Sequence, residues 1–233
     1  MIWFHEIVSE EKQKQKMGCR LPQLLLAAVC AVLVIGLVMP TLGVVPDKAN
    51  QAATADNCRQ ILVALKLYAN DHDGNYPDVD ESESMTSNDA FALLIREGFL
   101  KDERIFGAKS SKYYPDNDIG DPPNYPKVLE AGENHWAMTK DVTSNSAQKL
   151  PLIFENPAAA GWPPAWNCDA ARKMEKGRAW LGGKIVVGFD EGGVEIIRLE
   201  SAKGSQVGPK PDADGKNVFT RAAPVMEILD IEE

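Results

Sequence analysis

Residues 47–74 read DKANQAATADNCRQILVALKLYANDHDG and are rich in residues that favour helices. The apolar side chains recur at spacings of three and four residues, so they fall along one side of a helix. They are Cys58, Ile61, Leu62, Leu65 and Tyr68. Asp47 is placed to cap this helix, whereas Gly74 and Pro77 end it. The sequence therefore predicts an amphipathic helix over Asp47–Tyr68, whose apolar stripe must be covered by the core of a domain.

An uncharged and mostly apolar stretch, Leu21–Val45, comes directly before this helix. A bilayer core needs roughly 20 apolar residues in a helix, and backbone groups inside lipid must bond within the segment. We therefore expect a transmembrane helix over residues 19–45 that continues into the amphipathic helix. The alternative is a cleaved secretory signal with its core at Leu24–Val38.

The orientation follows from the basic residues that precede the apolar stretch. They are Lys12, Lys14, Lys16 and Arg20, and only Lys48 closely follows the stretch. The positive-inside rule then makes residues 1–18 a short basic cytoplasmic leader and exports the chain beyond residue 45. The sequence thus predicts a single-pass protein of the inner (cytoplasmic) membrane with a periplasmic or extracytoplasmic main domain.

The composition excludes several classes of protein. The chain has 233 residues, of which 44% are hydrophobic and 25% are charged, so a disordered tail, a collagen and a small disulfide scaffold are excluded. The net charge of −9 disfavours contact with phosphate backbones, and no general nucleic-acid-binding role is expected. Beyond the membrane segment only Cys58 and Cys168 remain, either as one disulfide across a long loop or as two buried free thiols.

The rest of the chain predicts a small antiparallel sheet. Strands are expected at His135–Thr139 and Leu150–Glu155, and a hairpin at Lys184–Phe189 and Val194–Leu199 with two glycines in its turn. A short helix is expected over residues 89–98, and the Pro-rich stretch 107–133 is expected to be a surface loop. We therefore predict an α+β fold, in which residues 46–200 form the exported domain and residues 201–233 form a flexible C-terminal tail.

Three segments resemble type IV pilin-like proteins, most closely the pseudopilins of type II secretion. The first is a short basic leader that ends in Gly18 directly before the apolar segment. The second is the continuous stretch Met39–Asp78, which is similar to the long family helix and its exit into the head domain. The third is GGKIVVGFDEGGVEII, Gly182–Ile197, which is similar to the last hairpin of many such proteins.

The resemblance implies how the N-terminus is processed and what the protein assembles with. Family leaders are cut after a glycine by a prepilin peptidase and the new N-terminus is methylated, so Gly18 and Cys19 are the candidate residues. Cys19 stands where the family has phenylalanine, and Gln23 stands where it has a glutamate that meets the α-amine of a neighbouring subunit. A glutamine can form hydrogen bonds but cannot neutralise that amine. The implied partners are other pilin-like subunits and inner-membrane proteins of a secretion or pilus assembly.

Residues that could carry chemistry are few. The catalytic motifs of the common hydrolases and the phosphate-binding glycine loop are missing from the sequence, so we predict that the protein is not an enzyme and needs no cofactor. His72 lies between Asp71 and Asp73, a pattern typical of a solvated helix end, and His135 has no evident partner. Trp162 and Trp166 form either an exposed recognition patch or the roof of a small core.

Calcium is the one metal to be considered, because some pseudopilins bind it near the C-terminal hairpin. Asp190 and Glu191 in the hairpin turn are the candidate ligands. Asp116, Asp118 and Asp121 in the preceding loop are a second group, but the sequence favours a plain polar turn for each group. The sequence as a whole favours a minor pilin-like structural subunit, and the alternative is a membrane-tethered binding module that does not polymerise.

Overall fold

The computed structural model describes residue 26 and residues 44–78, 85–146, 149–222 and 225–233. The predicted leader lies outside these residues. Of the predicted membrane helix over residues 19–45, only residues 26, 44 and 45 are described. No helix in the described part of the chain is both long enough and apolar enough to cross a bilayer.

The long helix α3 spans Val44–Asp71 and confirms the amphipathic helix predicted from the sequence. The helix begins earlier than expected, so Asp47 lies within its first turn and does not cap it. In this position the negative charge of Asp47 interacts favourably with the positive end of the helix dipole. The predicted stripe is buried, with Cys58, Ile61 and Leu65 fully inaccessible to solvent. Beyond the helix, Asp73 and Gly74 adopt positive φ and turn the chain away.

A second helix, α4 (Ser87–Arg96), begins at a capping box. The Thr86 hydroxyl accepts from the Asp89 backbone N–H, and the Asp89 carboxylate accepts from the Thr86 backbone N–H at 2.9 Å. Two donors at the open end of the helix are thereby satisfied. The helix confirms the short element expected over residues 89–98, although it starts two residues earlier.

The described strands form one antiparallel sheet. They are β1 (Trp136–Thr139), β2 (Pro151–Glu155), β3 (Lys184–Phe189), β4 (Val194–Arg198) and β5 (Ile228–Leu229). Their order across the sheet is β4-β3-β2-β1-β5, and every neighbouring pair is antiparallel. The α+β class and the antiparallel sheet predicted from the sequence are therefore confirmed.

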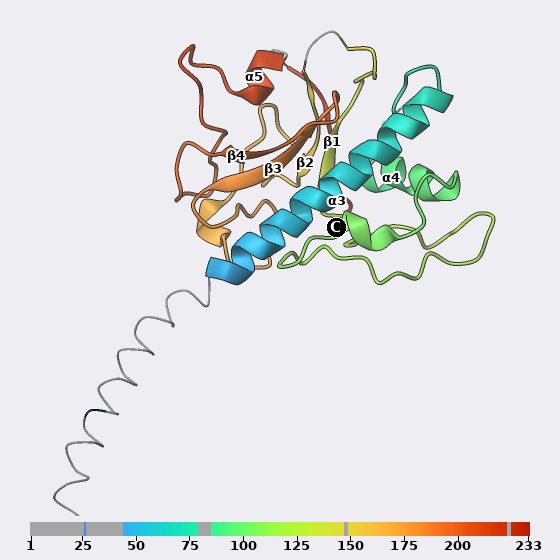
Figure 1. Cartoon of the computed structure of the whole chain (residues 1–233), viewed down its shortest axis with the longest axis horizontal. Coiled ribbons are helices and arrows are strands. Elements are labelled where there is room, and N and C mark those ends of the chain that lie inside the picture. The colour runs from blue at the N-terminus through green and yellow to red at the C-terminus, as the bar shows by residue number, and fades with distance from the viewer. Residues whose placement is uncertain (1–25, 27–43, 79–84, 147–148, 223–224) are drawn as a thin grey trace, which may run out of the picture. The chain divides into compact units, whose positions relative to one another are not determined.

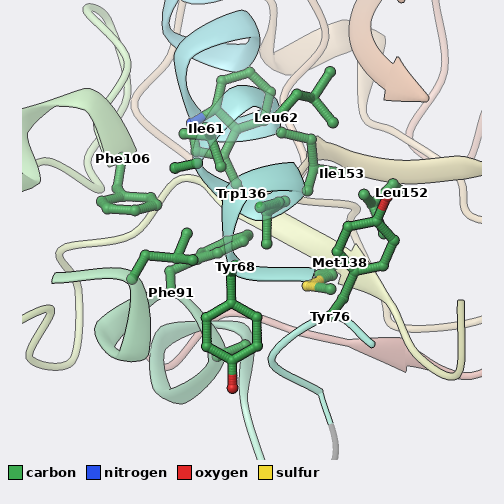
Figure 2. Close-up of a cluster of buried hydrophobic side chains, with 14 of the residues drawn as sticks. Ile61, Leu62, Tyr68, Tyr76, Phe91, Phe106, Trp136, Met138, Leu152 and Ile153 are labelled. Carbon is green, nitrogen blue, oxygen red and sulfur yellow. The ribbon is translucent and has the colours of Figure 1, made fainter. Parts of the chain in front are cut away.

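The sheet has two apolar faces, because successive side chains along a strand point to opposite sides. On one face Met138, Ile153 and Val186 join the α3 stripe and α4 in a core cluster, part of which is drawn in Figure 2. On the other face Phe154 and Val187 join a second cluster of loop residues and the short helix α5 (Val218–Ala222). Figure 1 shows α3 and α5 on opposite sides of the sheet.

Gly188 on β3 lets α3 approach the sheet closely. A β-carbon built at this position would lie 2.7 Å from the Cys58 sulfur and 2.8 Å from Leu62 Cδ1. Real side chains do not tolerate such contacts, so the space that a residue at 188 would occupy is filled by the helix. The glycine is needed here for close packing and not for its backbone conformation.

The C-terminal region corrects the prediction of a flexible tail over residues 201–233. Residues 225–233 include β5, which pairs with β1 through Met138 opposite Leu229, and Asp47–Glu233 forms one compact unit. The side chains of Leu229 and Ile231 are buried, whereas that of Asp230 between them is more exposed. This alternation is typical of a strand that is covered on one face. Only the two residues of β5 pair with β1.

The Pro-rich stretch 107–133 contains no helix or strand, as predicted, but it is more than a surface loop. Val128 and Leu129 are buried in the cluster beneath α3. The short 3-10 helix η2 (Glu103–Phe106) precedes the stretch and contributes Phe106, which is stacked on Phe91 of α4 at 5.1 Å between ring centres. The loop therefore closes one side of the core.

Candidate functional site

The densest group of buried polar side chains surrounds the carboxylate of Glu155, at the end of β2. Glu155 is completely inaccessible to solvent. It accepts hydrogen bonds from His135 Nε2 at 3.0 Å, Trp180 Nε1 at 2.8 Å and the Val186 backbone N–H at 2.7 Å. A buried carboxylate is tolerated only when its oxygens are satisfied in this way. The sheet places these groups together, because β2 lies between β1 and β3.

His135 is held in one tautomer by its neighbours, which corrects the expectation that it has no partner. Its Nε2 donates to Glu155, so Nδ1 must accept. Two donors face Nδ1, namely the Ser111 hydroxyl at 3.0 Å and the Asn156 amide at 2.9 Å. Burial lowers the pKa of His135, although the Glu155 carboxylate opposes this shift. The imidazole is therefore neutral at pH 7.

Arg178 brings a positive charge next to this group. Only 2% of its surface is exposed, and its guanidinium lies over the Trp180 ring at 4.2 Å from the ring centre. None of its three side-chain nitrogens has a hydrogen-bond partner. Burial lowers the pKa of Arg178, and the negative charges of Glu155 and Asp47 oppose that effect. The cation is thus held by a ring face and by nearby carboxylates.

This buried polar group joins strands and loops and is closed to substrates. His135 and Glu155 are covered on all sides, and an acid–base pair must reach the proton that it moves. Its hydrogen bonds connect β2 and β3 with His135, which directly precedes β1, and with the loop residues Ser111 and Asn156. We therefore assign it a structural role. A glutamate at the end of the apolar run PLIFE is the sequence signal that could have revealed it.

The cysteines resolve one alternative left by the sequence. Cys58 and Cys168 are both buried free thiols, so the disulfide between them is not formed. Cys58 belongs to the cluster under α3, whereas Cys168 belongs to the cluster on the opposite face of the sheet. The sheet itself separates the two sulfur atoms. The leader residues Gly18 and Cys19, and Gln23, lie outside the described residues.

The hairpin-turn carboxylates are used by the protein itself. Asp190 is buried and accepts from the Leu150 backbone N–H at 2.8 Å and the Glu191 backbone N–H at 2.9 Å. Glu191 is exposed and pairs with Lys149 at 3.1 Å. In the described part of the chain, these two residues do not belong to any group of carboxylates close enough to share a metal ion. The structure gives them the role of closing a turn.

Two further sequence candidates belong to the packing of the domain. Trp166 is fully buried in the second cluster, and both Trp162 and Trp166 contact the Phe219 ring of α5, which favours the roof of a core. His72 is stacked on Tyr68 at 3.8 Å and lies 3.3 Å from the carboxylate of Glu97. His72 therefore packs against its neighbours just beyond the C-terminal end of α3.

A different set of carboxylates comes together from positions that no sequence motif connects. One oxygen from each of Glu103, Asp116 and Glu133 lies within 4.8 Å of the other two. The residues are separated by 13 and 17 positions, a spacing that matches no metal motif, and Asp116 alone was among the sequence candidates. We call these three side chains the carboxylate cluster. It is the one group of residues in the described ranges that is arranged to hold a metal ion.

Comparisons with known proteins do not place the chain in a family. No protein-family model matches it, and no curated protein or solved structure matches it. The fold and the buried groups define an α+β protein in which a long helix covers one face of a five-stranded antiparallel sheet.

Proposed function

We propose that this protein is a pilin-like structural subunit, anchored in the inner membrane by its N-terminal helix, of a type II secretion or type IV pilus-type assembly. One observation carries the proposal. Helix α3 already includes Val44 and Val45, the last two residues of the uncharged stretch Leu21–Val45. The helix that covers the sheet therefore starts inside the segment predicted to cross the membrane, which is the arrangement that the resemblance to pilins implies.

The exposed side of α3 adds support. Val63 and Leu67 are four residues apart on this helix and have exposed fractions of 60% and 51%. Residues at this spacing lie next to each other on a helix surface. An apolar pair on the side opposite the buried stripe suits a helix that packs against equivalent helices in an assembly. The edge strand β4 and the loops carry no comparable role in this proposal.

The second candidate function is a membrane-tethered module that does not polymerise. Gln23 favours it, because a glutamine cannot neutralise the α-amine of a neighbouring subunit inside lipid. Both candidates require a membrane-bound chain. They differ in whether the leader is removed, and this difference can be measured.

The test is the mass of the N-terminal peptide from the full-length chain, purified from membranes of cells with and without a prepilin peptidase. The subunit proposal expects a chain that begins at Cys19, with a methyl group on its α-amine, only when the peptidase is present. A Gly18→Val variant is the matched control and should keep Met1 under both conditions. Retention of Met1 in the unaltered membrane-bound chain would select the tethered module. A chain found free of the membrane would contradict both functions.

A further inference from the structure

One buried oxygen of the carboxylate cluster has no donor in hydrogen-bond geometry. Glu103 is completely inaccessible to solvent, and its Oε2 accepts from the Leu129 backbone N–H at 3.3 Å. Its Oε1 meets no donor in hydrogen-bond geometry, although the Asn117 backbone N–H lies near enough to the carboxylate to stabilise its charge. An unsatisfied buried carboxylate oxygen is costly, because it has lost its water and gained nothing in exchange. In native structures such an atom usually indicates a bound water or ion.

The other two carboxylates approach Glu103 from a different part of the chain. Asp116 is exposed and belongs to the Pro-rich stretch, while Glu133 is half-buried and lies just before β1. Backbone groups hold them in place, since Glu133 Oε1 accepts from the Asp116 N–H at 3.0 Å and Glu133 Oε2 accepts from the Glu130 N–H at 2.8 Å. The Asp116 carboxylate in turn accepts from the Asp118 N–H at 2.7 Å, so backbone donors orient both side chains.

Among the described residues no ion pair neutralises this concentration of negative charge, and Lys127, whose charge also reaches Asp116, is paired with Asp118. The nearby lysines are already used, because Lys127 pairs with Asp118 at 2.6 Å and Lys112 pairs with Glu233 at 3.3 Å. None of the ion pairs among the described residues includes a member of the carboxylate cluster. A cation placed between the three groups would remove the repulsion between them.

The geometry points to a calcium-binding site formed by Glu103, Asp116 and Glu133. Three oxygens within 4.8 Å of one another can share one ion, because two ligands on opposite sides of calcium are about twice 2.4 Å apart. All three donors are carboxylate oxygens, which favour a hard cation over zinc. The irregular loop suits calcium, which accepts variable geometry and water ligands, whereas magnesium demands a near-ideal octahedron. Asp116, on the solvent side, leaves room for water to complete the coordination.

A bound ion would connect segments that no regular element joins. Glu103 belongs to η2, Asp116 to the Pro-rich stretch and Glu133 to the entry of β1. The inference goes beyond the proposed function, because it holds for a subunit and for a tethered module alike. A failure to bind calcium would leave the N-terminal mass unchanged, so the two proposals fail separately.

The experiment is isothermal titration of calcium chloride into the full-length chain in detergent micelles at pH 7.5, after treatment with a chelator. We expect one saturable site per chain, and a higher melting temperature with calcium than with the chelator, because a ligand that binds only the folded state stabilises it. A parallel titration with magnesium chloride should give clearly weaker binding. The absence of saturable calcium binding up to millimolar concentrations would overturn the proposal.

Two variants assign the binding to the cluster. Asp116→Asn should weaken calcium binding at least about tenfold, because affinity depends on the number of charged ligands. Asp116 is exposed, so this variant should fold normally. The matched control is Asp214→Asn, an exposed aspartate of another loop, whose affinity should stay within about twofold of the unaltered chain. Equal affinities for the two variants would overturn the assignment.

A Glu103→Gln variant tests the remaining explanation, in which the cluster holds a shared proton and no metal. Calcium binding should fall in this variant as it does in Asp116→Asn. If Glu103→Gln instead raised the melting temperature in chelator while the unaltered chain bound no calcium, the shared proton would be correct and the calcium site wrong.

Discussion

Replacing Glu155 with glutamine tests the buried polar group. The change keeps the shape of the side chain but removes its charge, and it replaces one of two acceptor oxygens with a donor. Val186 and Trp180 still need an acceptor, and His135 would have to change tautomer to face the new donor. In that tautomer Nδ1 carries a proton and meets the Asn156 amide, also a donor, at 2.9 Å.

The expected cost follows from these contacts and from Arg178. Removing the charge of one residue from a buried charged group lowers the free energy of unfolding by about 3–5 kcal/mol, because the partner charges stay buried without compensation. Arg178 has no hydrogen-bond partner of its own, so the charge of Glu155 is a main source of its stabilisation. We therefore expect Glu155→Gln to lower the free energy of unfolding by about 3 kcal/mol. For a typical urea dependence of about 2 kcal/mol per molar, the midpoint falls by about 1.5 M.

The assay is urea unfolding of the full-length chain in detergent, followed by the fluorescence of the buried Trp136, Trp166 and Trp180. The matched control is Glu195→Gln on the edge strand β4, an exposed carboxylate that pairs with Lys149. It should cost less than about 1 kcal/mol, as exposed ion pairs do. Equal midpoints for the two variants would refute the reasoning that the Glu155 charge stabilises the fold.

Three further predictions concern the core and its titrating groups. Gly188→Ala should destabilise the fold by about 1–3 kcal/mol, because its β-carbon would lie 2.7 Å from the Cys58 sulfur, and adding Cys58→Ala should recover part of this loss in a double-mutant cycle. Burial raises the pKa of Asp78 to about 6, above its unfolded value, so its stabilisation is complete at low pH and is lost as the pH rises through 6. Asp78→Asn should therefore gain stability relative to the unaltered chain as the pH rises from about 4 to about 6, by up to about 1.4 kcal/mol per pH unit, and the gain should level off above that range. A difference in the free energy of unfolding that does not change with pH would contradict the raised pKa. Burial also raises the pKa of the Cys58 and Cys168 thiols. Peptide mass spectrometry should therefore find Cys58 unmodified after iodoacetamide treatment of the folded chain and alkylated after unfolding. Rapid labelling of Cys58 in the folded chain would contradict its burial.

The elements that the sequence predicts well are those with a local signal. The α3 stripe repeats every three or four residues, and α4 combines a short apolar run with a glycine just beyond its end, so both helices were found within three residues of their ends. The hairpin of β3 and β4 is joined by a short glycine turn and was found equally well. These signals lie within about ten residues of one another in the chain, where periodicity and turn chemistry operate.

The parts that were missed depend on partners far away in the chain. Strand β5 has two residues, and its pairing with β1 cannot be recognised from so short a run. His135 and Glu155 look isolated in the sequence, and only the sheet brings them within 3.0 Å. The carboxylate cluster joins Glu103 to Glu133 through a loop without regular structure. No spacing rule applies to such groups, because an irregular loop sets their geometry.

The pairing of β5 with β1 has a consequence for how quickly the domain forms. Met138 meets Leu229, and Ser87 bonds to the carbonyl of Asp230, 143 residues later in the chain. Closing contacts over such distances requires a large loss of chain entropy before any gain, so topologies of this kind reach the native state slowly. Until residues 228–231 arrive, the outer edge of β1 has unpaired backbone groups. A newly made chain therefore has an interval in which this edge can pair with the wrong neighbour.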